Sequence, residues 1–567
     1  RCIHCTRCVR FSTEIAGVTD MGMLNRGENA EITTYLEKAL DSELSANVID
    51  LCPVGALTSK PYAFVARPWE LKKTETVDVM DAVGSNIRVD ARGSEVLRVL
   101  PRLHEGINEE WISDKTRYAC DGLKRQRLDR PYVRGADGKL KPASWDQAFA
   151  TIASKAKEVS GKQMAAIAGD MVDAESMFAL KSLMTALGSP NIDCRQDGSK
   201  LTANARAGYI FNTTIAGIER ADALLIVGSN PRWEAALVNA RIRKTWLHKP
   251  IKIGVVGQRL DLTYDYDYLG AGPQTLAEIA SGEHGFAQVL KDAKAPMLIV
   301  GQGALSRVDG ESVLAACRAI AEQTGMVYDE SRSETPGEDG TEPTVTITPA
   351  WNGFNVLHTA AARVAGLDLG FVPGDGGKDV DAILKAAKTG AVKFLYLLAA
   401  DEIEAKGFSN CFVVYQGHHG DKGAQAADVV LPGAAYTEKD GLYVNTEGRV
   451  QRGVGAAFPP GEARADWKIL RALSDVLGQT LPYDTLEDLR MALNKAHPVF
   501  TGLDVTEAAD WSAFAELSLT DGKMDDGVPF ASPIENFYMT DPISRSSATM
   551  AACTEDFVVP KRKAAAS

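Results

Sequence analysis

Apolar and polar residues alternate over residues 86–100, and one turn interrupts the alternation. A period of two places successive side chains on opposite faces of a strand, so this stretch predicts two short strands. The apolar positions are Ile87, Val89, Val96, Leu97 and Val99, and Arg92-Gly93 marks the turn. The surrounding sequence predicts a small β-rich module over residues 67–130, which ends at the Arg130-Pro131 boundary.

Beyond residue 131, short apolar runs alternate with amphipathic stretches such as 233–247 and 311–323. Such runs are typical of buried strands in parallel sheets, and the amphipathic stretches are expected to be the helices that cover both faces. The pattern predicts an α/β domain with doubly wound parallel sheets over residues 131–500. The predicted strands are 165–168, 223–227, 251–256, 297–300, 394–398, 411–415 and 428–431.

Three stretches lack a clear period. Residues 1–66 suggest short helices and loops, and residues 329–344 contain too few apolar groups to pack, which predicts an exposed loop. From about residue 500 the pattern is irregular and ends in Lys561-Arg562-Lys563, so residues 501–567 are interpreted as a docking tail. The predicted organisation is four parts: 1–66, 67–130, 131–500 and 501–567.

Length, charge and hydropathy narrow the function classes. The chain has 567 residues, enough for about three or four domains. Its apolar runs are far shorter than the roughly 20 residues that cross a bilayer, so direct membrane insertion is not expected. The net charge of −13, without a long basic patch, argues against nucleic-acid binding. The chain begins at Arg1 without a methionine, and we expect it to be a fragment of a longer protein.

Cysteines carry the strongest chemical signal. Cys2, Cys5 and Cys8 recur at every third position, and Cys52 is followed by a proline. Cys-x2-Cys-x2-Cys with a remote cysteine-proline is typical of a 4Fe-4S cluster, in which each thiolate binds one iron. A two-cluster ferredoxin would have another cysteine where Ser12 stands, so one cluster is predicted. Structural zinc is the alternative, although zinc sites usually use two separated Cys-x2-Cys pairs.

Charged neighbours surround the predicted ligands. His4 lies inside the cysteine run, but four thiolates already serve four irons, so it is expected to be a neighbour. Arg1, Arg7 and Arg10 either raise the reduction potential of the cluster or are ordinary solvated charges.

The remaining cysteines are scattered singly, which suits a reducing compartment. They are Cys120, Cys194, Cys317, Cys411 and Cys553. The Gly301-x-Gly303 stretch has Ser306 where a dinucleotide fingerprint needs glycine, and no Gly-x4-Gly-Lys-Ser/Thr loop occurs, so neither NADH binding nor ATPase activity is predicted.

Two further motifs could suggest chemistry. A metal site is one interpretation of His418-His419, but neighbouring side chains of an extended chain point opposite ways, so a loop is expected and His418→Ala should be nearly silent. Glu70, Glu109 and Glu110 are interpreted as solvated or interface charges rather than general acids.

Four sequence stretches together resemble one family. They are RCIHCTRCVR at 1–10, CPVGALTSK at 52–60, DAVGSN at 81–86 and INEEWISDKTR at 107–117. They resemble the large peripheral-arm iron-sulfur subunits of respiratory NADH:quinone oxidoreductase (complex I) of alphaproteobacterial or mitochondrial type. The resemblance implies that Cys2, Cys5, Cys8 and Cys52 hold one 4Fe-4S cluster of an electron relay from flavin toward quinone. It also implies that full-length members carry a 2Fe-2S and a second 4Fe-4S cluster, which this chain lacks.

The long second half resembles molybdopterin oxidoreductases such as formate dehydrogenase. The matching residues are 228–231, 427–432, Glu438, Gly441, 445–449 and Gln451, with Tyr415, Gln416 and Gly417 assigned to a relict pterin cleft. The small module of that superfamily often holds a cluster of its own, but the corresponding positions here are Asp78, Asp81, Ser85 and Ser113. The resemblance therefore implies a catalytically silent scaffold without molybdenum, NAD or FMN. A molybdenum or tungsten pterin enzyme of the formate dehydrogenase type is the alternative.

The same resemblance implies partners and location. The expected partners are the flavin and NADH-binding subunit, the 2Fe-2S subunit and the iron-sulfur subunits that lead to quinone. The expected location is peripheral, on the cytoplasmic face of the bacterial inner membrane or the matrix face of the mitochondrial one.

Overall fold

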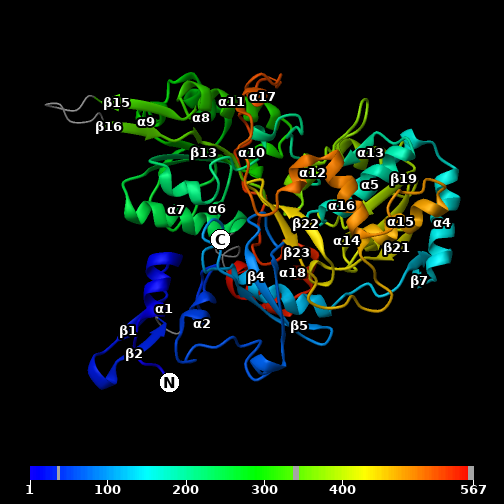
Figure 1. The fold of residues 1–567 in the computed structure, drawn as a ribbon, viewed down its shortest axis with the longest axis horizontal. Coiled ribbons are helices and arrows are strands. Elements are labelled where there is room, and N and C mark those ends of the chain that lie inside the picture. The colour runs from blue at the N-terminus through cyan, green and yellow to red at the C-terminus, as the bar shows by residue number, and fades with distance from the viewer. Residues whose placement is uncertain (35–38, 336–343, 521, 560–567) are drawn as a thin grey trace.

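The N-terminal segment is built from short elements around the predicted ligands. The structure is a computed structural model, and it describes residues 1–34, 39–335, 344–520 and 522–559. Helix α1 (Arg7–Arg10) continues into a π-helix, η1 (Phe11–Ala16), which is followed by the antiparallel hairpin of β1 (Met21–Leu24) and β2 (Glu31–Thr34). Helix α2 (Asn47–Leu51) ends directly before Cys52 and packs against α1, as the blue part of Figure 1 shows.

The predicted β-rich module is a three-stranded antiparallel sheet. Its strands are β3 (Lys72–Val77), β4 (Asn86–Arg92) and β5 (Glu95–Pro101), and they are followed by α3 (Asp114–Tyr118) and the 3-10 helix η5 (Ala119–Lys124). Ile87, Val89, Val96 and Val99 are buried, which confirms the alternation seen in the sequence.

The large domain contains two mainly parallel sheets, which confirms the α/β fold class. One is five-stranded and wholly parallel, in the order β12-β11-β10-β13-β18. Its strands are β10 (Ala223–Val227), β11 (Lys252–Val256), β12 (Asp267–Gly270), β13 (Pro296–Val300) and β18 (Phe354–Val356). Leu225 and Val227 face one hydrophobic core while Leu224 and Ile226 face another, so both faces of the sheet are covered.

The other sheet is seven-stranded, in the order β7-β6-β21-β20-β19-β8-β9, and only the β6 and β7 edge is antiparallel. The strands are β6 (Tyr132–Arg134), β7 (Leu140–Pro142), β8 (Met164–Ala168), β9 (Asn191–Asp193), β19 (Phe394–Leu398), β20 (Phe412–Gly417) and β21 (Val429–Pro432). Its lobe lies on the right of Figure 1, with α4 (Trp145–Lys157), α5 (Ala174–Ala186), α13 (Val380–Thr389), α15 (Asp466–Val476) and α16 (Leu486–Ala496). The five-stranded lobe lies at upper left with α7 (Ala236–His248), α8 (Pro273–Ser281), α9 (Gly285–Asp292), α10 (Gln302–Leu305) and α11 (Gly310–Gln323).

Two predictions of secondary structure need correction. The helix expected over 233–247 is divided at Ala235 into α6 (Pro231–Glu234) and α7, because Ala235 leaves the helical region with φ −154° and ψ 76°. The loop expected over 329–344 instead includes β15 (Ser331–Thr335), which pairs antiparallel with β16 (Thr344–Thr348), a run of Thr, Val and Ile that favours a strand. Residues 336–343 of the expected loop lie outside the described residues.

The C-terminal tail is mostly irregular but contains short helices, α17 (Trp511–Ala515), α18 (Pro542–Ser546) and α19 (Ala548–Cys553). It runs between the two lobes in Figure 1, and α18 and α19 pack against η5 of the β-rich module. Lys561-Arg562-Lys563 lies outside the described residues. Among the described helices, none has the length and apolar character needed to cross a membrane.

Candidate iron-sulfur site

The first three cysteines lie on a tightly curved loop at the start of α1. His4 and Thr6 adopt left-handed backbone angles, with φ of 53° and 59°, and the His4 amide donates to Cys2 Sγ at 3.4 Å. Cys2 and Cys5 are exposed, whereas Cys8 is buried. Burial raises the pKa of the Cys8 thiol, and the nearby Cys5 and Cys2 sulfurs raise it further. The loop therefore gathers three sulfurs close enough to interact electrostatically.

Cys52 lies where α2 ends, in a turn that favours its thiolate. Partial burial opposes ionisation, but the backbone amides of Val54, Leu57, Ala56 and Gly55 point at the sulfur and lower the pKa of Cys52 below its ordinary value. Gly55 makes this turn possible with φ of 61°, a conformation that glycine adopts without strain. Because the thiolate is the form that binds a metal, the turn prepares Cys52 as a ligand.

The chemistry of these four residues fits an iron-sulfur cubane. In the part of the chain that the structure describes, no three His, Cys, Asp or Glu side chains approach closely enough to hold a single metal ion. A cubane does not require this, since each of its four thiolates binds a different iron. The ligand set of Cys2, Cys5, Cys8 and Cys52 stays a prediction.

An arginine of the large domain anchors the helix that follows Cys8. Arg243, on α7, donates from Nη2 to the Thr13 carbonyl at 2.6 Å and from Nε to the Glu14 carbonyl at 3.1 Å. These carbonyls lie near the C-terminal end of η1, where positive charge is favourable. Gly17 permits the approach, because a Cβ there would lie 2.8 Å from the Arg243 guanidinium carbon.

A second arginine anchors the segment before Cys52. Arg232, on α6, donates from Nε to Glu43 Oε2 at 2.9 Å, and the Trp233 indole donates to the other oxygen of Glu43 at 3.1 Å. The Arg232 and Glu43 side chains are only 8% and 10% exposed. Burial raises the pKa of Glu43 despite the adjacent guanidinium. This buried ion pair fixes the stretch before Cys52 to the five-stranded lobe.

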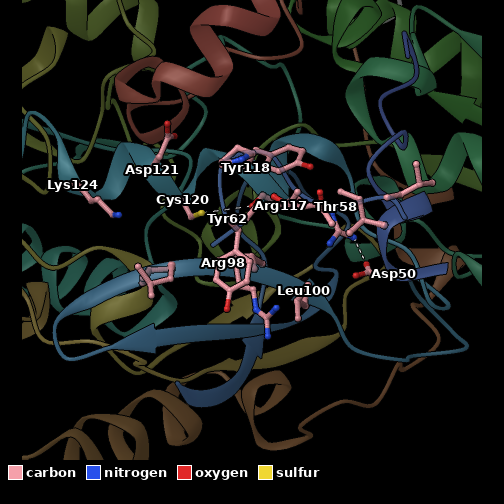
Figure 2. Close-up of a pocket in the computed structure, with 18 residues that line it drawn as sticks. Asp50, Thr58, Tyr62, Arg98, Leu100, Arg117, Tyr118, Cys120, Asp121 and Lys124 are labelled. Carbon is pink, nitrogen blue, oxygen red and sulfur yellow. Dashed lines mark hydrogen bonds and ion pairs between the residues drawn. The ribbon is translucent and has the colours of Figure 1, made fainter. Parts of the chain in front are cut away.

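The chain after Cys52 is fixed to the β-rich module around a pocket of about 350 Å³. Figure 2 shows Arg117 beside Asp50, with an Nη2 to Oδ2 distance of 2.5 Å, and Arg98 beside Tyr62. The guanidinium of Arg98 lies 4.5 Å from the centre of the Tyr62 ring. Cys120 also lines the pocket. These contacts join α2 to α3 and Tyr62 to β5.

Four family models match the chain. Residues 1–58 match the ferredoxin-like domain of NADH-quinone oxidoreductase subunit 3, and residues 71–121 match the NDSU1/NuoG-like 4Fe-4S domain of NADH-ubiquinone oxidoreductase. Residues 127–476 match molybdopterin oxidoreductase, and residues 505–553 match a C-terminal domain of NADH-ubiquinone oxidoreductase.

Full-length relatives agree with these matches. The chain is 50% identical over 555 residues to the mitochondrial NADH dehydrogenase [ubiquinone] iron-sulfur protein 1 of Solanum tuberosum, covering 98% of this chain and 71% of the relative. It is also 50% identical to the mitochondrial 78 kDa subunits of NADH-ubiquinone oxidoreductase from Neurospora crassa and Candida albicans, covering 98% of this chain and 72% and 74% of those relatives. The chain belongs to the iron-sulfur subunit family of NADH-ubiquinone oxidoreductase.

A solved structure supports the fold of this NADH-ubiquinone oxidoreductase family member. Acetylene hydratase from Pelobacter acetylenicus aligns with a TM-score of 0.51 over 85% of this chain and 78% of its own. At 15% identity, the likeness shows the shared architecture and carries no statement about activity.

In this family member, the four positions expected to lack cluster ligands are buried and polar. Asp78, Asp81, Ser85 and Ser113 are between 1% and 5% exposed. Thr116 Oγ1, in α3, donates to Asp78 Oδ2 at 2.8 Å and lies 2.8 Å from Ser113 Oγ. Asp78 directly follows β3 and Ser113 directly precedes α3, so these hydrogen bonds join the two elements. Among residues 71–121, Cys120 is the only cysteine, and burial raises its pKa to about 12.

Replacing Asp78 with Asn is expected to weaken the pH dependence of stability. Burial, and then the neighbouring Asp81 carboxylate, raises the pKa of Asp78 to about 8. A carboxyl whose folded pKa lies above its unfolded value stabilises the fold at low pH, and this stabilisation is lost between about pH 4 and pH 8. Chemical unfolding at pH 5 and pH 8 should show a difference smaller by on the order of 2 kcal/mol in Asp78→Asn than in wild type. Exposed Asp146→Asn is the control, and an equal pH dependence in both variants would contradict the expectation.

The two histidines depart from their predicted arrangement. They follow β20, but both are buried, and their Nδ1 atoms lie 2.5 Å apart, so the rings do not point opposite ways. His419 Nε2 lies 3.0 Å from the Gly122 carbonyl oxygen of η5. Burial lowers the pKa of both rings, that of His419 to about 4, which keeps them neutral. The pair joins the seven-stranded sheet to the β-rich module.

His418→Ala is therefore expected to lower stability rather than to be silent. The substitution removes a buried partner of His419, which costs about 1–3 kcal/mol. Thermal or chemical unfolding measures this loss, and iron content should stay at the wild-type value. Exposed His248→Ala should leave both unchanged. If the two variants unfold alike, the His418–His419 contact does not contribute to stability.

Sequence reasoning missed the residues that position the site. Arg232 and Arg243 lie in an ordinary helical pattern, and their partners are 189 and 229 positions away. Glu109, interpreted as a solvated or interface charge, forms ion pairs with Arg241 at 3.1 Å and Lys244 at 2.6 Å. A polar residue with a buried charge partner has no local sequence signal.

Proposed function

We propose that this chain is an electron-relay subunit of the peripheral arm of NADH:quinone oxidoreductase. The proposal rests on one observation above the others: the chain is half identical to iron-sulfur subunits of that complex. Its four cysteines lie on two adjoining segments, in which Cys2 and Cys5 are exposed and the pKa of Cys52 is lowered. A single 4Fe-4S cluster on Cys2, Cys5, Cys8 and Cys52 would accept and release one electron at a time. The chain itself has no proposed substrate site.

The residues around the thiolates would set when the cluster accepts an electron. Amides of residues 54–57 aimed at Cys52 favour negative charge on sulfur, which raises the reduction potential of a cluster bound there. The aromatic pair Phe11 and Trp111, with ring centres 5.0 Å apart, belongs to the same hydrophobic cluster as Cys8 and would shield that ligand from water. Arg232 and Arg243 hold the two ligand-bearing stretches on one rigid surface.

The partners proposed are the flavin and NADH-binding subunit, the 2Fe-2S subunit and the iron-sulfur subunits that lead to quinone. Relatives of this chain are named as mitochondrial subunits of the complex. We place this chain peripherally, on the matrix face of the mitochondrial inner membrane or the cytoplasmic face of a bacterial one. In full-length members a 2Fe-2S and a second 4Fe-4S cluster would complete the relay.

A molybdenum or tungsten pterin enzyme of formate dehydrogenase type is not favoured. Such an enzyme would use a cluster in the β-rich module to carry electrons from the pterin, and the matching positions Asp78, Asp81, Ser85 and Ser113 carry no thiol. Asp78 and Ser113 instead take part in hydrogen bonds with Thr116.

Anaerobic iron and sulfide analysis, combined with low-temperature EPR of the reduced chain, tests the proposal. About four irons and four sulfides per chain, with one reduced-cluster signal, are expected. Zinc in the chain, without a redox signal, would show that the cysteines form a structural zinc site rather than an electron relay. Molybdenum, tungsten or a second cluster signal would instead favour a pterin enzyme of the formate dehydrogenase type.

A further inference from the structure

The five-stranded sheet has a crevice of the kind that binds ligands in other parallel sheets. From β10, the chain proceeds to β11 on one side and later to β13 on the other, so the strand order reverses at β10. Ligands of open α/β sheets bind outside the carboxyl ends of the strands at such a point. Here those ends carry Gly228 after β10, Gly257 after β11, and Gly301 and Gly303 after β13.

A segment of the same chain fills this crevice. Residues 525–534, here named the crossing segment, pass over the strand ends on their way from the top of Figure 1 to α18. The Phe530 amide donates to the Ala271 carbonyl at 2.9 Å. A Cβ built on Gly303 would lie 2.1 Å from the Ala531 oxygen, and one on Gly257 would lie 3.3 Å from the Phe530 oxygen. The glycines thus admit protein backbone where a phosphate would otherwise approach.

Side chains lock the crossing segment in place. Phe530 is fully buried, and the guanidinium carbon of Arg307 lies 5.2 Å from its ring centre. Arg307 also donates to the Val528 carbonyl at 2.5 Å. On the other side, Ser532 donates to Glu234 Oε1 at 2.7 Å, and Ser229, just after β10, donates to Glu234 Oε2 at 2.6 Å. Phe530 is buried, whereas most other residues of the segment, including Val528 and Pro529, are exposed, so the segment is anchored at Phe530, Ser532 and the contacts of Arg307.

The space left beside the segment is lined by more acidic than basic side chains. A cavity of about 570 Å³ lies between the crossing segment, the β-rich module and the seven-stranded lobe. Its lining includes Asp170, Asp197, Glu234, Glu402 and Asp541 but only one lysine, Lys115. Arg363 pairs with Asp197 at 2.7 Å and Arg545 pairs with Glu402 at 2.6 Å, so these two guanidinium groups are already engaged by carboxylates rather than free to hold an anionic group.

We infer that the crossing segment is a built-in occupant of the ligand crevice, so that this domain does not take a phosphate-bearing cofactor such as molybdopterin. The residues present do not fit that group: the chain's own backbone stands at the glycine turns, and carboxylates line the remaining cavity. The inference concerns the large domain alone and stands whether or not the cysteines hold a cluster.

Gly272 offers a probe that acts on the crossing segment directly. A Cβ at Gly272 would lie 3.2 Å from Pro529 Cα, 3.4 Å from Phe530 N and 3.6 Å from the Val528 oxygen. Its φ of −179° is open to any residue, and it precedes α8. Gly272→Val therefore pushes against the segment. The matched control is Gly285→Val, also at a helix start, where a Cβ would meet nothing within 4 Å.

Hydrogen exchange on the full chain, read on peptides that cover residues 525–534, gives the first result. We expect the Phe530 amide, which donates to the Ala271 carbonyl, to be protected in wild type, to exchange at least about tenfold faster in Gly272→Val, and to be unchanged in Gly285→Val. Iron content and the EPR spectrum should be equal in all three. Unprotected exchange in wild type, or equal exchange in the two variants, would overturn the inference. If Gly272→Val does not fold, Ser532→Ala replaces it with the same expected direction.

Equilibrium dialysis with GDP, a soluble nucleoside diphosphate, gives the second result. Wild type is expected to show no saturable binding of GDP at millimolar concentration. A site with a Kd of about 1 mM, which corresponds to a binding free energy of about −4.1 kcal/mol, would be half filled in that range. Saturable binding by wild type would show an open crevice and overturn the inference. Either result leaves the relay proposal to its own test, since GDP binding does not report on the cysteines.

Discussion

Replacing Cys52 with Ala is expected to abolish the 4Fe-4S cluster and electron transfer through the assembled complex, while the large domain stays folded. A cubane that loses one of four thiolates loses the ligand of one iron. Mutating a residue that only supports a metal ligand typically lowers metal affinity or activity by about 10–100-fold. Loss of the ligand itself should therefore lower the rate of electron transfer by more than about 100-fold. EPR of the reduced chain and quinone reduction by the complex measure the two effects.

Cys120→Ala is the matched control for this prediction. Cys120 is also partly buried and lines the pocket beside the turn of Cys52, but burial raises its pKa to about 12, unlike that of Cys52. We expect the control variant to keep the EPR signal. Wild-type quinone reduction by a complex with Cys52→Ala would show that Cys52 is not a ligand, whatever the control does.

Arg232→Met is expected to lower the free energy of unfolding by about 3–5 kcal/mol, because it leaves the Glu43 carboxylate buried without its ion pair. The same change frees the stretch before Cys52 from the five-stranded lobe, so iron should be lost faster to a chelator. Chemical unfolding measures the first effect, and the rate of iron release to a chelator measures the second.

Two further variants show whether the effects of Arg232→Met come from the lost ion pair with Glu43 or from removing any arginine of this lobe. Arg259→Met removes an exposed arginine of the same lobe and should change neither measurement. The double variant Arg232→Met with Glu43→Met removes both charges and should regain part of the lost stability, since no buried charge is left unpaired. A double variant as unstable as Arg232→Met alone would mean that the ion pair is not what holds the segment.

The parts of the fold that follow from local pattern could be predicted from the sequence. The runs 223–227 and 394–398 match the observed strands end to end, because strands buried on both faces need an unbroken apolar run. The alternation at 86–100 likewise predicted β4 and β5. The cysteine spacing predicted iron-sulfur chemistry, since three thiolates on one tight loop require fixed intervals along the chain.

Features that depend on long-range contacts could not be predicted. Nothing near Phe530 in the sequence indicates that it packs at glycine turns more than 200 positions earlier. The His418–His419 pair was expected to be a loop whose side chains have no shared role, but the bend after β20 brings the two rings together. Buried charges such as Arg232 and Glu43 look like surface residues until their partners are known.

The anchoring arginines also impose an order on biosynthesis. A ribosome adds about 5–20 residues per second, so it reaches Arg232 about 10–40 s after Glu43, and it reaches Arg243 later still. During that interval the cysteine loops have emerged without the lobe that fixes them.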